Sequence, residues 1–304
     1  MTDFRRIQVR KDTCLNVALA GDQRSTAVMM LHGFPESHRT WREIAPKLED
    51  RFYLVMPDQL GFAGSDRPED DKAYESDKLI DDIFELADAL GLETFALVGH
   101  DWGGAIAWTA ALKRPERLSR LAIINAPHPY IFQKSLIEDS EQRDASQYIT
   151  AFRTPGFEKT VEHMGFEAFF EKTFSKHVDL SIIPQAEKQQ YIAEWSQPGA
   201  LTAMLNWYRA SKLIVPPPGV TIPLPDFLLK AFPKIEVPTL VVWGMKDSAL
   251  LPVQLNGLNE LIDDILVARL SDAGHFAPWE VPDLVIRALE PFRAADLPAI
   301  APAA

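Results

Sequence analysis

The chain has 304 residues, a formal net charge of −12 and 47% hydrophobic residues. These values are typical of a globular protein with one large domain or two small ones, and the acidic balance argues against a nucleic-acid partner, because phosphates attract basic surfaces. Cys14 is the only cysteine, which excludes an internal disulfide. Because no apolar run approaches the roughly 20 residues of a membrane helix, we expect a cytoplasmic monomer or homodimer without membrane contact.

Short apolar runs alternate along the chain with helical patterns. The runs predict strands at 15–19, 28–31, 53–56, 95–98, 121–125, 240–243 and 266–270. Amphipathic spacing predicts helices at 37–48, 76–90, 102–114 and 282–292. Such alternation predicts an α/β fold, a mostly parallel sheet covered by helices on both faces, with the active site beyond the carboxyl ends of the strands.

One long segment interrupts this alternation. Residues 131–229 are rich in aromatic residues, Gln, Glu and Lys, lack strand-like runs and end in a Pro-rich stretch at 216–225. We interpret this segment as a helical cap over the site, with a Pro-rich linker that returns to the sheet. The core domain then comprises residues 1–130 and 230–293, and we expect the Ala- and Pro-rich tail at 294–304 to be frayed.

The segment Gly99-His100-Asp101-Trp102-Gly103-Gly104 places an acidic residue between a predicted strand and a predicted helix. In a nucleophile elbow this point of the chain carries the attacking residue, and small neighbours let strand and helix pass closely. Asp101 is ionised at neutral pH if its pKa is near the reference value of roughly 3.9. A carboxylate that attacks a saturated carbon forms an ordinary ester, so the sequence favours opening of a C–O or C–halogen bond.

Two further residues complete a catalytic triad. Asp247 follows the strand near 239–243, and His275 follows the last predicted strand, in the chain order nucleophile, acid, histidine. Singly, Asp247 is equally well read as a loop acid or helix cap, and His275 as an ordinary loop histidine. Their joint occurrence favours the triad. The turn at Phe34 aims its backbone N–H at the same point as that of Trp102, which predicts an oxyanion hole.

The motifs "HGFPES", "GHDWGG" and "LNWYRA", with the Asp247 and His275 loops, resemble the epoxide hydrolases of the α/β-hydrolase superfamily over nearly the whole chain. The resemblance implies two cap tyrosines over the nucleophile, for which Tyr208 in "LNWYRA" and Tyr148 in "SQYITAFRTPG" are the matches. A phenol keeps its proton at neutral pH and can hydrogen-bond to the oxygen of an opening epoxide. The alternative is that both tyrosines are ordinary residues of the cap core.

The resemblance implies hydrolysis of a small apolar epoxide by water to a vicinal diol, through an ester on Asp101 that water activated by His275 and Asp247 hydrolyses. No cofactor or metal is implied. Glu36 is a candidate for positioning that water, or simply an acid in the first turn of a helix. We expect an apolar substrate pocket lined by Phe34, Trp102, Phe152, Met204 and Trp207.

Two alternative functions are compatible with the same fold. A haloalkane or haloacid dehalogenase would use the same Asp nucleophile, but the haloalkane enzymes commonly carry Asn where this chain has Phe34, and fluoroacetate dehalogenases carry arginines where it has Trp102 and Ala105. A catalytically silent binding protein is the second alternative, yet such proteins usually lose members of the triad, which this chain retains.

Overall fold

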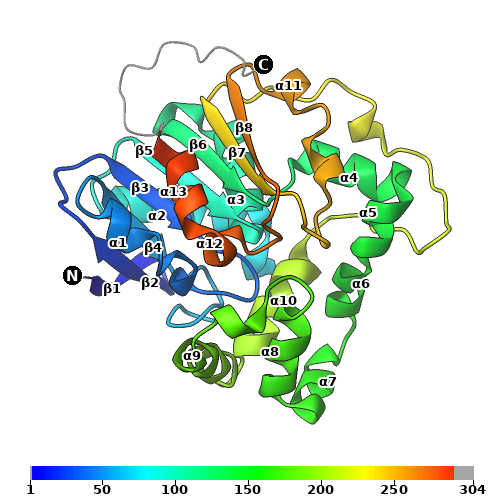
Figure 1. Cartoon of the computed structure of the whole chain (residues 1–304), viewed down its shortest axis with the longest axis horizontal. Helices are drawn as coiled ribbons and strands as arrows, with labels where there is room; N and C mark the ends of the chain where they lie inside the picture. Colours follow the sequence, from blue (N-terminus) through cyan, green and yellow to red (C-terminus); the bar gives the residue numbers. More distant parts are fainter. Residues whose placement is uncertain (1, 291–304) are drawn as a thin grey trace.

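The computed structural model describes residues 2–290, and within them the chain forms one sheet with helices on both faces (Figure 1). The sheet of these residues has eight strands in the order β1-β2-β4-β3-β5-β6-β7-β8. β2 pairs antiparallel with β1 and β4, and the other pairs are parallel. The strands are β1 (Asp3–Arg10), β2 (Thr13–Ala20), β3 (Ala27–Leu31), β4 (Tyr53–Pro57), β5 (Phe95–His100), β6 (Leu118–Ile124), β7 (Thr239–Gly244) and β8 (Ile265–Leu270).

The predicted α/β fold is confirmed, and each of the seven predicted strands overlaps one of β2 to β8. β1 has no counterpart among the predictions. This strand lies at the edge of the sheet, and most of its residues, including Phe4 and Arg5, are exposed. Its order comes mainly from backbone pairing with β2. Only Ile7 and Val9 alternate toward the core, which is too short a period-two signal to predict the strand.

Helices cover the two faces of the sheet because strand residues alternate between them. Met29 and Val55 point into a core that includes residues of α2 and α3, whereas Met30 and Leu54 point into a second core with residues of α1 and α13. The helices are α1 (Ala45–Leu48), α2 (Ser76–Ala89), α3 (Trp102–Lys113), α4 (Pro129–Glu138), α5 (Ser140–Ala145), α6 (Gln147–Arg153), α7 (Phe157–Met164), α8 (Phe166–Phe174), α9 (Gln185–Trp195), α10 (Ala200–Ala210), α11 (Leu258–Leu261), α12 (Ala277–Glu280) and α13 (Pro282–Leu289).

The prediction of one helix at 37–48 is wrong. The structure has a 3-10 turn at His38–Trp41 and a separate short helix, α1, because Pro46 lacks the N–H that a continuous helix would require and its ring clashes with the preceding turn. The other 3-10 turns of the described residues are Asp71–Tyr74, Pro115–Arg117, Leu180–Ile182, Asp226–Leu228 and Pro252–Leu255. The end of the predicted helix at 282–292, like the expected tail at 294–304, lies partly or wholly outside the described residues.

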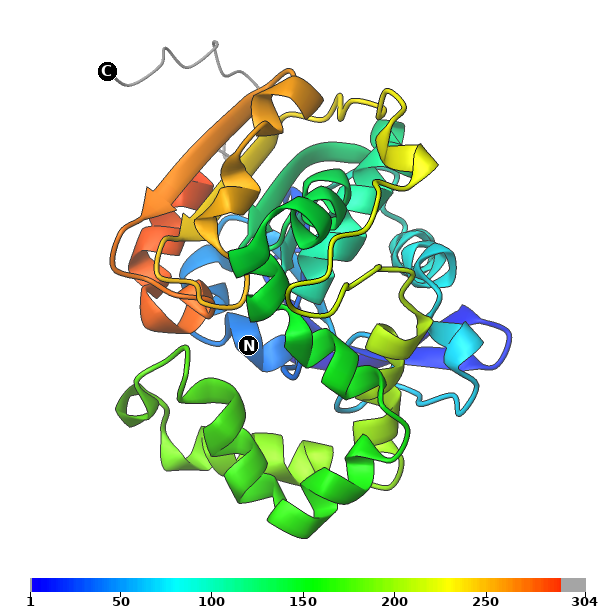
Figure 2. The same ribbon diagram turned by 90° about the vertical axis from the view of Figure 1, so that its right-hand side faces the viewer.

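Helices α4 to α10 lie between β6 and β7 in the chain, in the segment that the sequence assigns to the cap. Figures 1 and 2 show α6 to α10 as a group of helices beyond one end of the sheet. α4 begins at Pro129, slightly before the predicted start of the cap, and the chain returns to β7 through a largely irregular stretch, 211–238. Because β5 and β7 end toward these helices, cap side chains can reach groups at the carboxyl ends of the strands.

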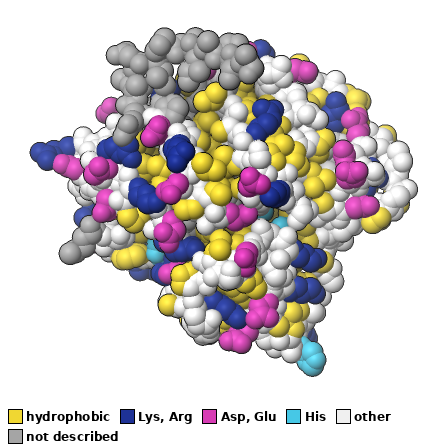
Figure 3. All heavy atoms as spheres, in the orientation of Figure 1, with side chains coloured by type: hydrophobic (Ala, Val, Ile, Leu, Met, Phe, Trp, Pro, Cys, Tyr) yellow, Lys and Arg dark blue, Asp and Glu magenta, His cyan; other side chains and the backbone are white. Residues whose placement is uncertain are grey.

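The charge pattern of the surface and the lengths of the helices bear on whether the partner could be a nucleic acid or a membrane. Acidic and basic side chains are interspersed among hydrophobic ones on the face in Figure 3, which shows no extended basic field. Across residues 2–290, no helix has the length and apolar character that crossing a membrane requires.

The turn from β5 to α3 is a crowded part of the backbone. Asp101 adopts φ 50° and ψ −120°, a conformation that is strained for a residue with a side chain. A Cβ at Gly103 would overlap the backbone carbonyl oxygen of Leu31, and one at Gly33 would overlap the Asp101 side chain. The glycines therefore let β3 and α3 approach closely enough to hold Asp101 at the end of the sheet.

We predict that Gly103→Ala lowers the free energy of unfolding by about 2 to 3 kcal/mol, because the added methyl group meets backbone that cannot rotate away. Urea denaturation measures the change. Gly91→Ala is the control: Gly91 has φ 72° and open space around its Cβ position, so this change should cost only about 1 kcal/mol of backbone strain. Equal losses of unfolding free energy in the two variants would contradict the close approach of α3 to β3 at Gly103.

Candidate active site

The structure brings Asp101, Asp247 and His275 together at the carboxyl end of the sheet. Asp101 follows β5, Asp247 lies just beyond β7, and His275 follows β8. The Nδ1 atom of His275 is 2.7 Å from Oδ2 of Asp247, and its Nε2 is 3.6 Å from Oδ2 of Asp101. One imidazole ring thus lies between two carboxylates, in the order that the sequence predicts.

The Asp247 carboxylate is held by hydrogen bonds on both oxygens. Backbone N–H groups of Ala249 and Leu250 donate to Oδ1 at 2.9 Å each, and the Asn125 amide donates to Oδ2 at 2.8 Å. Burial alone raises the pKa of Asp247, but the His275 charge and these donors outweigh burial and leave the pKa below its usual value. Asp247 is therefore a carboxylate that fixes the orientation of the His275 ring.

The sequence analysis missed Asn125. This residue follows β6 directly and has φ 43°, and its Oδ1 accepts a hydrogen bond of 2.9 Å from the Gly244 N–H at the end of β7. It therefore ties the Asp247 loop to the neighbouring strand. The available signal is a polar residue directly after the buried residues 121–124, although the predicted strand 121–125 includes Asn125.

The backbone N–H of Phe34 donates to Oδ1 of Asp101 at 2.7 Å. Burial raises the pKa of the Asp101 carboxyl, an effect opposed by the positive charge of His275 and by hydrogen bonds from the N–H groups of Phe34 and Trp102. The reference pKa assumed from the sequence is therefore not that of the folded protein. Oδ1 is held by the Phe34 N–H, whereas Oδ2 faces His275.

His275 has a pKa raised to about 9. Burial opposes its ionisation, but the charge of Asp247 and its hydrogen bond outweigh burial, and Asp101 and Glu36 add to the rise. At neutral pH the ring is therefore an imidazolium that balances the two carboxylates.

Behind this ring lies a second buried pair. Nε2 of His100 is 2.8 Å from the backbone carbonyl oxygen of His275, and Nδ1 of His100 is 3.0 Å from Oε2 of Glu36. The Glu36 carboxylate is buried, and its oxygens make no hydrogen bond within the part of the chain described. His100 and Glu36 thus support the loop of His275 from the core side.

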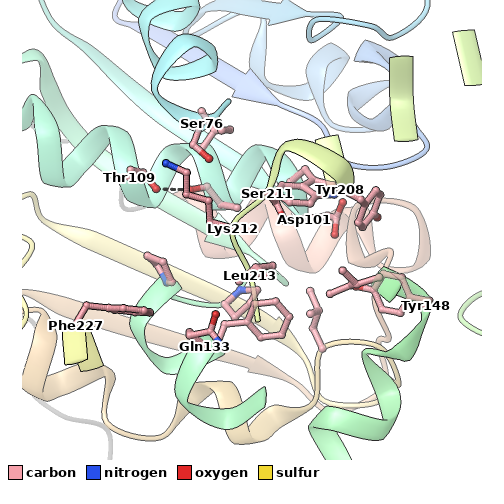
Figure 4. A pocket seen from close by; sticks show the side chains of 18 residues that line it. Ser76, Asp101, Thr109, Gln133, Tyr148, Tyr208, Ser211, Lys212, Leu213 and Phe227 are labelled. Atoms are coloured by element: carbon pink, nitrogen blue, oxygen red, sulfur yellow. Dashed lines mark hydrogen bonds between the residues drawn. The ribbon is translucent and has the colours of Figure 1, made fainter. Parts of the chain in front are cut away.

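The two predicted cap tyrosines lie on α6 and α10, close to the nucleophile. The ring centroids of Tyr148 and Tyr208 are 6.1 Å apart, and Figure 4 shows Asp101 beside Tyr208, with Tyr148 across from it. Burial, followed by the nearby Asp101 charge, raises the pKa of both phenols above the usual value of 10. Both hydroxyls therefore keep their protons and are available as hydrogen-bond donors.

Two cavities meet at these groups, because both are lined by Asp101, Tyr148 and Tyr208. The smaller cavity, about 260 Å³, also contacts Trp102 and extends toward Ser76, Lys212 and Phe227 (Figure 4). The larger, about 570 Å³, contacts His275, His177 and a group of aromatic residues, namely Phe34, Phe152, Phe157 and Phe169. The reacting groups therefore lie where two largely apolar spaces join.

Phe34, Trp102 and Phe152 contact these cavities as predicted, but Met204 and Trp207 contact neither. Met204 is buried in the hydrophobic core, and the Trp207 indole donates to the Leu60 carbonyl at 2.9 Å. The predicted pocket role is wrong for these two residues. Helix α10 is buried on most sides, so hydrophobicity alone did not indicate which of its faces reaches the cavities.

Comparison with known proteins agrees with this geometry. Residues 26–282 match the model of the alpha/beta hydrolase fold family. The chain is 37% identical to the AB hydrolase superfamily protein YfhM of Bacillus subtilis, over 77% of this chain and 78% of that protein. It is 31% identical to Epoxide hydrolase A of Mycobacterium tuberculosis, over 91% of this chain and 93% of that protein.

A similar solved structure comes from a group described as novel epoxide hydrolases of the alpha/beta hydrolases superfamily in metagenomes from hot environments. It has a TM-score of 0.89 and 42% identity, and the match covers 97% of this chain and all of that one. From these matches over nearly its whole length, the chain belongs to the epoxide hydrolases of the α/β-hydrolase superfamily.

Proposed function

We propose that this protein hydrolyses small apolar epoxides to vicinal diols through an ester on Asp101. The observation that carries the proposal is the meeting of one carboxylate and two phenols at the junction of two largely apolar cavities. A carboxylate attacks the ring carbon, and a phenol hydrogen-bonds to the oxygen on which negative charge develops. The reaction requires no cofactor.

In the first step, Oδ2 of Asp101 forms a bond to one epoxide carbon, and the C–O bond of the ring breaks. The electron pair moves to the epoxide oxygen, where Tyr148 and Tyr208 donate hydrogen bonds and one of them transfers its proton. Oδ1 remains with the backbone donors Phe34 and Trp102. The product of this step is an alkyl ester of Asp101.

In the second step, water attacks the ester carbonyl carbon. Formation of the ester removes the negative charge of Asp101, one of the charges that raise the pKa of His275, so the ring can give its proton to the tyrosinate that the first step leaves. Neutral His275, oriented by Asp247, then accepts a proton from water, while the N–H groups of Phe34 and Trp102 stabilise the oxyanion on Oδ1. The bond between the carbonyl carbon and Oδ2 then breaks, and His275 passes the proton to Oδ2, which leaves as a hydroxyl oxygen of the diol. The water oxygen stays on Asp101, and the new carboxyl returns its remaining proton to His275, which restores the starting carboxylate and imidazolium. Glu36 supports water positioning indirectly, through its contact with His100.

A halide-releasing reaction at Asp101 is not favoured. Phe34 offers one backbone donor, which the Asp101 carboxylate already occupies, and no second side-chain donor at that position. The tyrosine pair, in contrast, suits an oxygen leaving group that stays attached to the substrate.

We predict that His275→Gln stalls after the first step. Asp101 attacks without a base, so incubation with styrene oxide should add the full mass of the epoxide to the intact protein, whereas wild-type enzyme turns the ester over. Mass spectrometry of the protein and its peptides measures the adduct and its position. Asp101→Asn is the control and should carry no adduct. If His275→Gln gains no mass under conditions in which the wild type forms diol, the proposed division of the two steps is wrong.

Tyr148→Phe and Tyr208→Phe should each slow ester formation about ten- to a thousandfold, because each removes one donor to the developing alkoxide, and the double variant should be slower still. Rapid-quench measurement of the ester in single turnovers gives the rate. Tyr130→Phe is the matched control, since its hydroxyl donates to the Leu228 carbonyl at 3.2 Å and it lines neither cavity. If both single variants form the ester at the wild-type rate, the two tyrosines only pack within the cap and do not donate to the epoxide oxygen.

We expect Asp101→Asn to lower the pKa of His275 from about 9, because one of the carboxylates that stabilise the imidazolium becomes neutral. An NMR titration of the His275 ring measures the shift, with Asp144→Asn, elsewhere on the larger cavity, as the control. In the wild type, ester hydrolysis should accordingly accelerate as pH rises through a pKa below 9. If the His275 pKa is unchanged in Asp101→Asn, then loss of the Asp101 charge on ester formation does not convert His275 into a base.

A further inference from the structure

His177 is a cap residue that packs against the loop of His275. It follows α8 and contacts the larger cavity together with Asp101 and His275. The ring centroids of the two histidines are 5.7 Å apart. The backbone at His177 also packs closely against the loop of His275, because a Cβ at Gly274 would lie 3.1 Å from the His177 carbonyl oxygen. The cap thus places a second imidazole beside the triad.

A contact with a residue of the core domain orients the His177 ring. Its Nδ1 atom is 3.2 Å from the hydroxyl oxygen of Ser248, the residue directly after Asp247. Because Nδ1 is used in this contact, Nε2 is the ring nitrogen left for a molecule in the cavity that His177 lines. His177 therefore adds a polar ring to a cavity whose wall also carries a group of aromatic residues.

The charge state of this ring differs from that of His275. Burial, with a further contribution from the His275 charge, lowers the pKa of His177 to about 4. A neutral imidazole beside an imidazolium avoids like-charge repulsion, and one of its nitrogens donates a hydrogen bond while the other accepts one. His177 thus remains neutral throughout the pH range in which His275 loses its proton.

We propose that His177 and His275 together position the water molecule that hydrolyses the Asp101 ester, an inference that rests on the proposed function. Both rings line the larger cavity and their centroids are 5.7 Å apart, so one water in that cavity can lie within hydrogen-bond distance, about 2.8 Å, of a nitrogen of each ring. The water gives its proton to His275 and keeps only a hydrogen bond to Nε2 of His177. His177 is therefore a positioning residue, and no bond forms or breaks at its ring.

Substitution of His177 by Phe and by Gln tests this role. Phe keeps the ring shape without a polar atom, whereas Gln retains a hydrogen-bonding group. With styrene oxide in single turnovers, His177→Phe should slow ester hydrolysis about tenfold and leave the rate of ester formation within about twofold of wild type. His177→Gln should recover most of the lost rate. His163→Phe, the same change at an exposed cap position outside both cavities, should alter neither step.

The outcomes separate this inference from the proposed function. Unchanged ester hydrolysis in His177→Phe, or an equal loss of rate in both steps, overturns the role of His177 while diol formation by the wild type upholds the function. Absence of any ester or diol in the wild type overturns the function itself. If His177→Phe does not fold, His177→Ala is assayed with added imidazole: recovery of ester hydrolysis supports the role, and no recovery contradicts it.

Discussion

The buried ion cluster of Asp101, His275 and Asp247 is the interaction on which the rest of the site depends. Removing two carboxylates from water is costly, and the protein offsets this cost with one imidazolium between them and with hydrogen bonds from backbone N–H groups and from Asn125. In the proposed cycle, the same coupling sets the order of the two steps. While Asp101 is charged, His275 holds its proton, and once Asp101 is an ester, His275 becomes a base.

The ion cluster requires an exact backbone path. Asp101 leaves β5 in a strained conformation, and β3 passes so close to α3 that Gly33 and Gly103 have no room for a side chain. This crowding directs the Phe34 N–H toward Asp101 Oδ1. The strain of one residue and the absent side chains of two others thus convert a strand-to-helix turn into a site for a buried carboxylate.

The cap contributes the groups that the sheet cannot. Tyr148 and Tyr208 reach the nucleophile from α6 and α10, and His177 reaches the triad from the segment after α8. The two tyrosines also line both cavities. Under the proposed function, substituents on either side of an epoxide have separate spaces, and chemistry and substrate selection share the same residues at the boundary between core and cap.

The sequence by itself determined what depends on local pattern. Buried parallel strands form continuous apolar runs, which located β2 to β8, and catalytic residues follow the ends of such strands, which located Asp101, Asp247 and His275 for comparison with the structure. Edge strand β1 was not predicted because its order comes mainly from pairing, with only Ile7 and Val9 packed on the core. The break in the helix predicted at 37–48 was not predicted because amphipathic spacing does not register the missing N–H of Pro46.

Only the tertiary structure decided which distant residues meet. Met204 and Trp207 resembled pocket residues in composition but pack into the core. His177 carries no local signal, and Asn125 carries only its place at the end of a strand, yet both lie beside the triad. The pKa values of Asp101 and His275 likewise depend on burial and on charges more than 20 residues away in the chain, as the separation of Asp247 from His275 illustrates. Local sequence fixes the period of burial, but distances across the fold and the local dielectric exist only in the packed molecule.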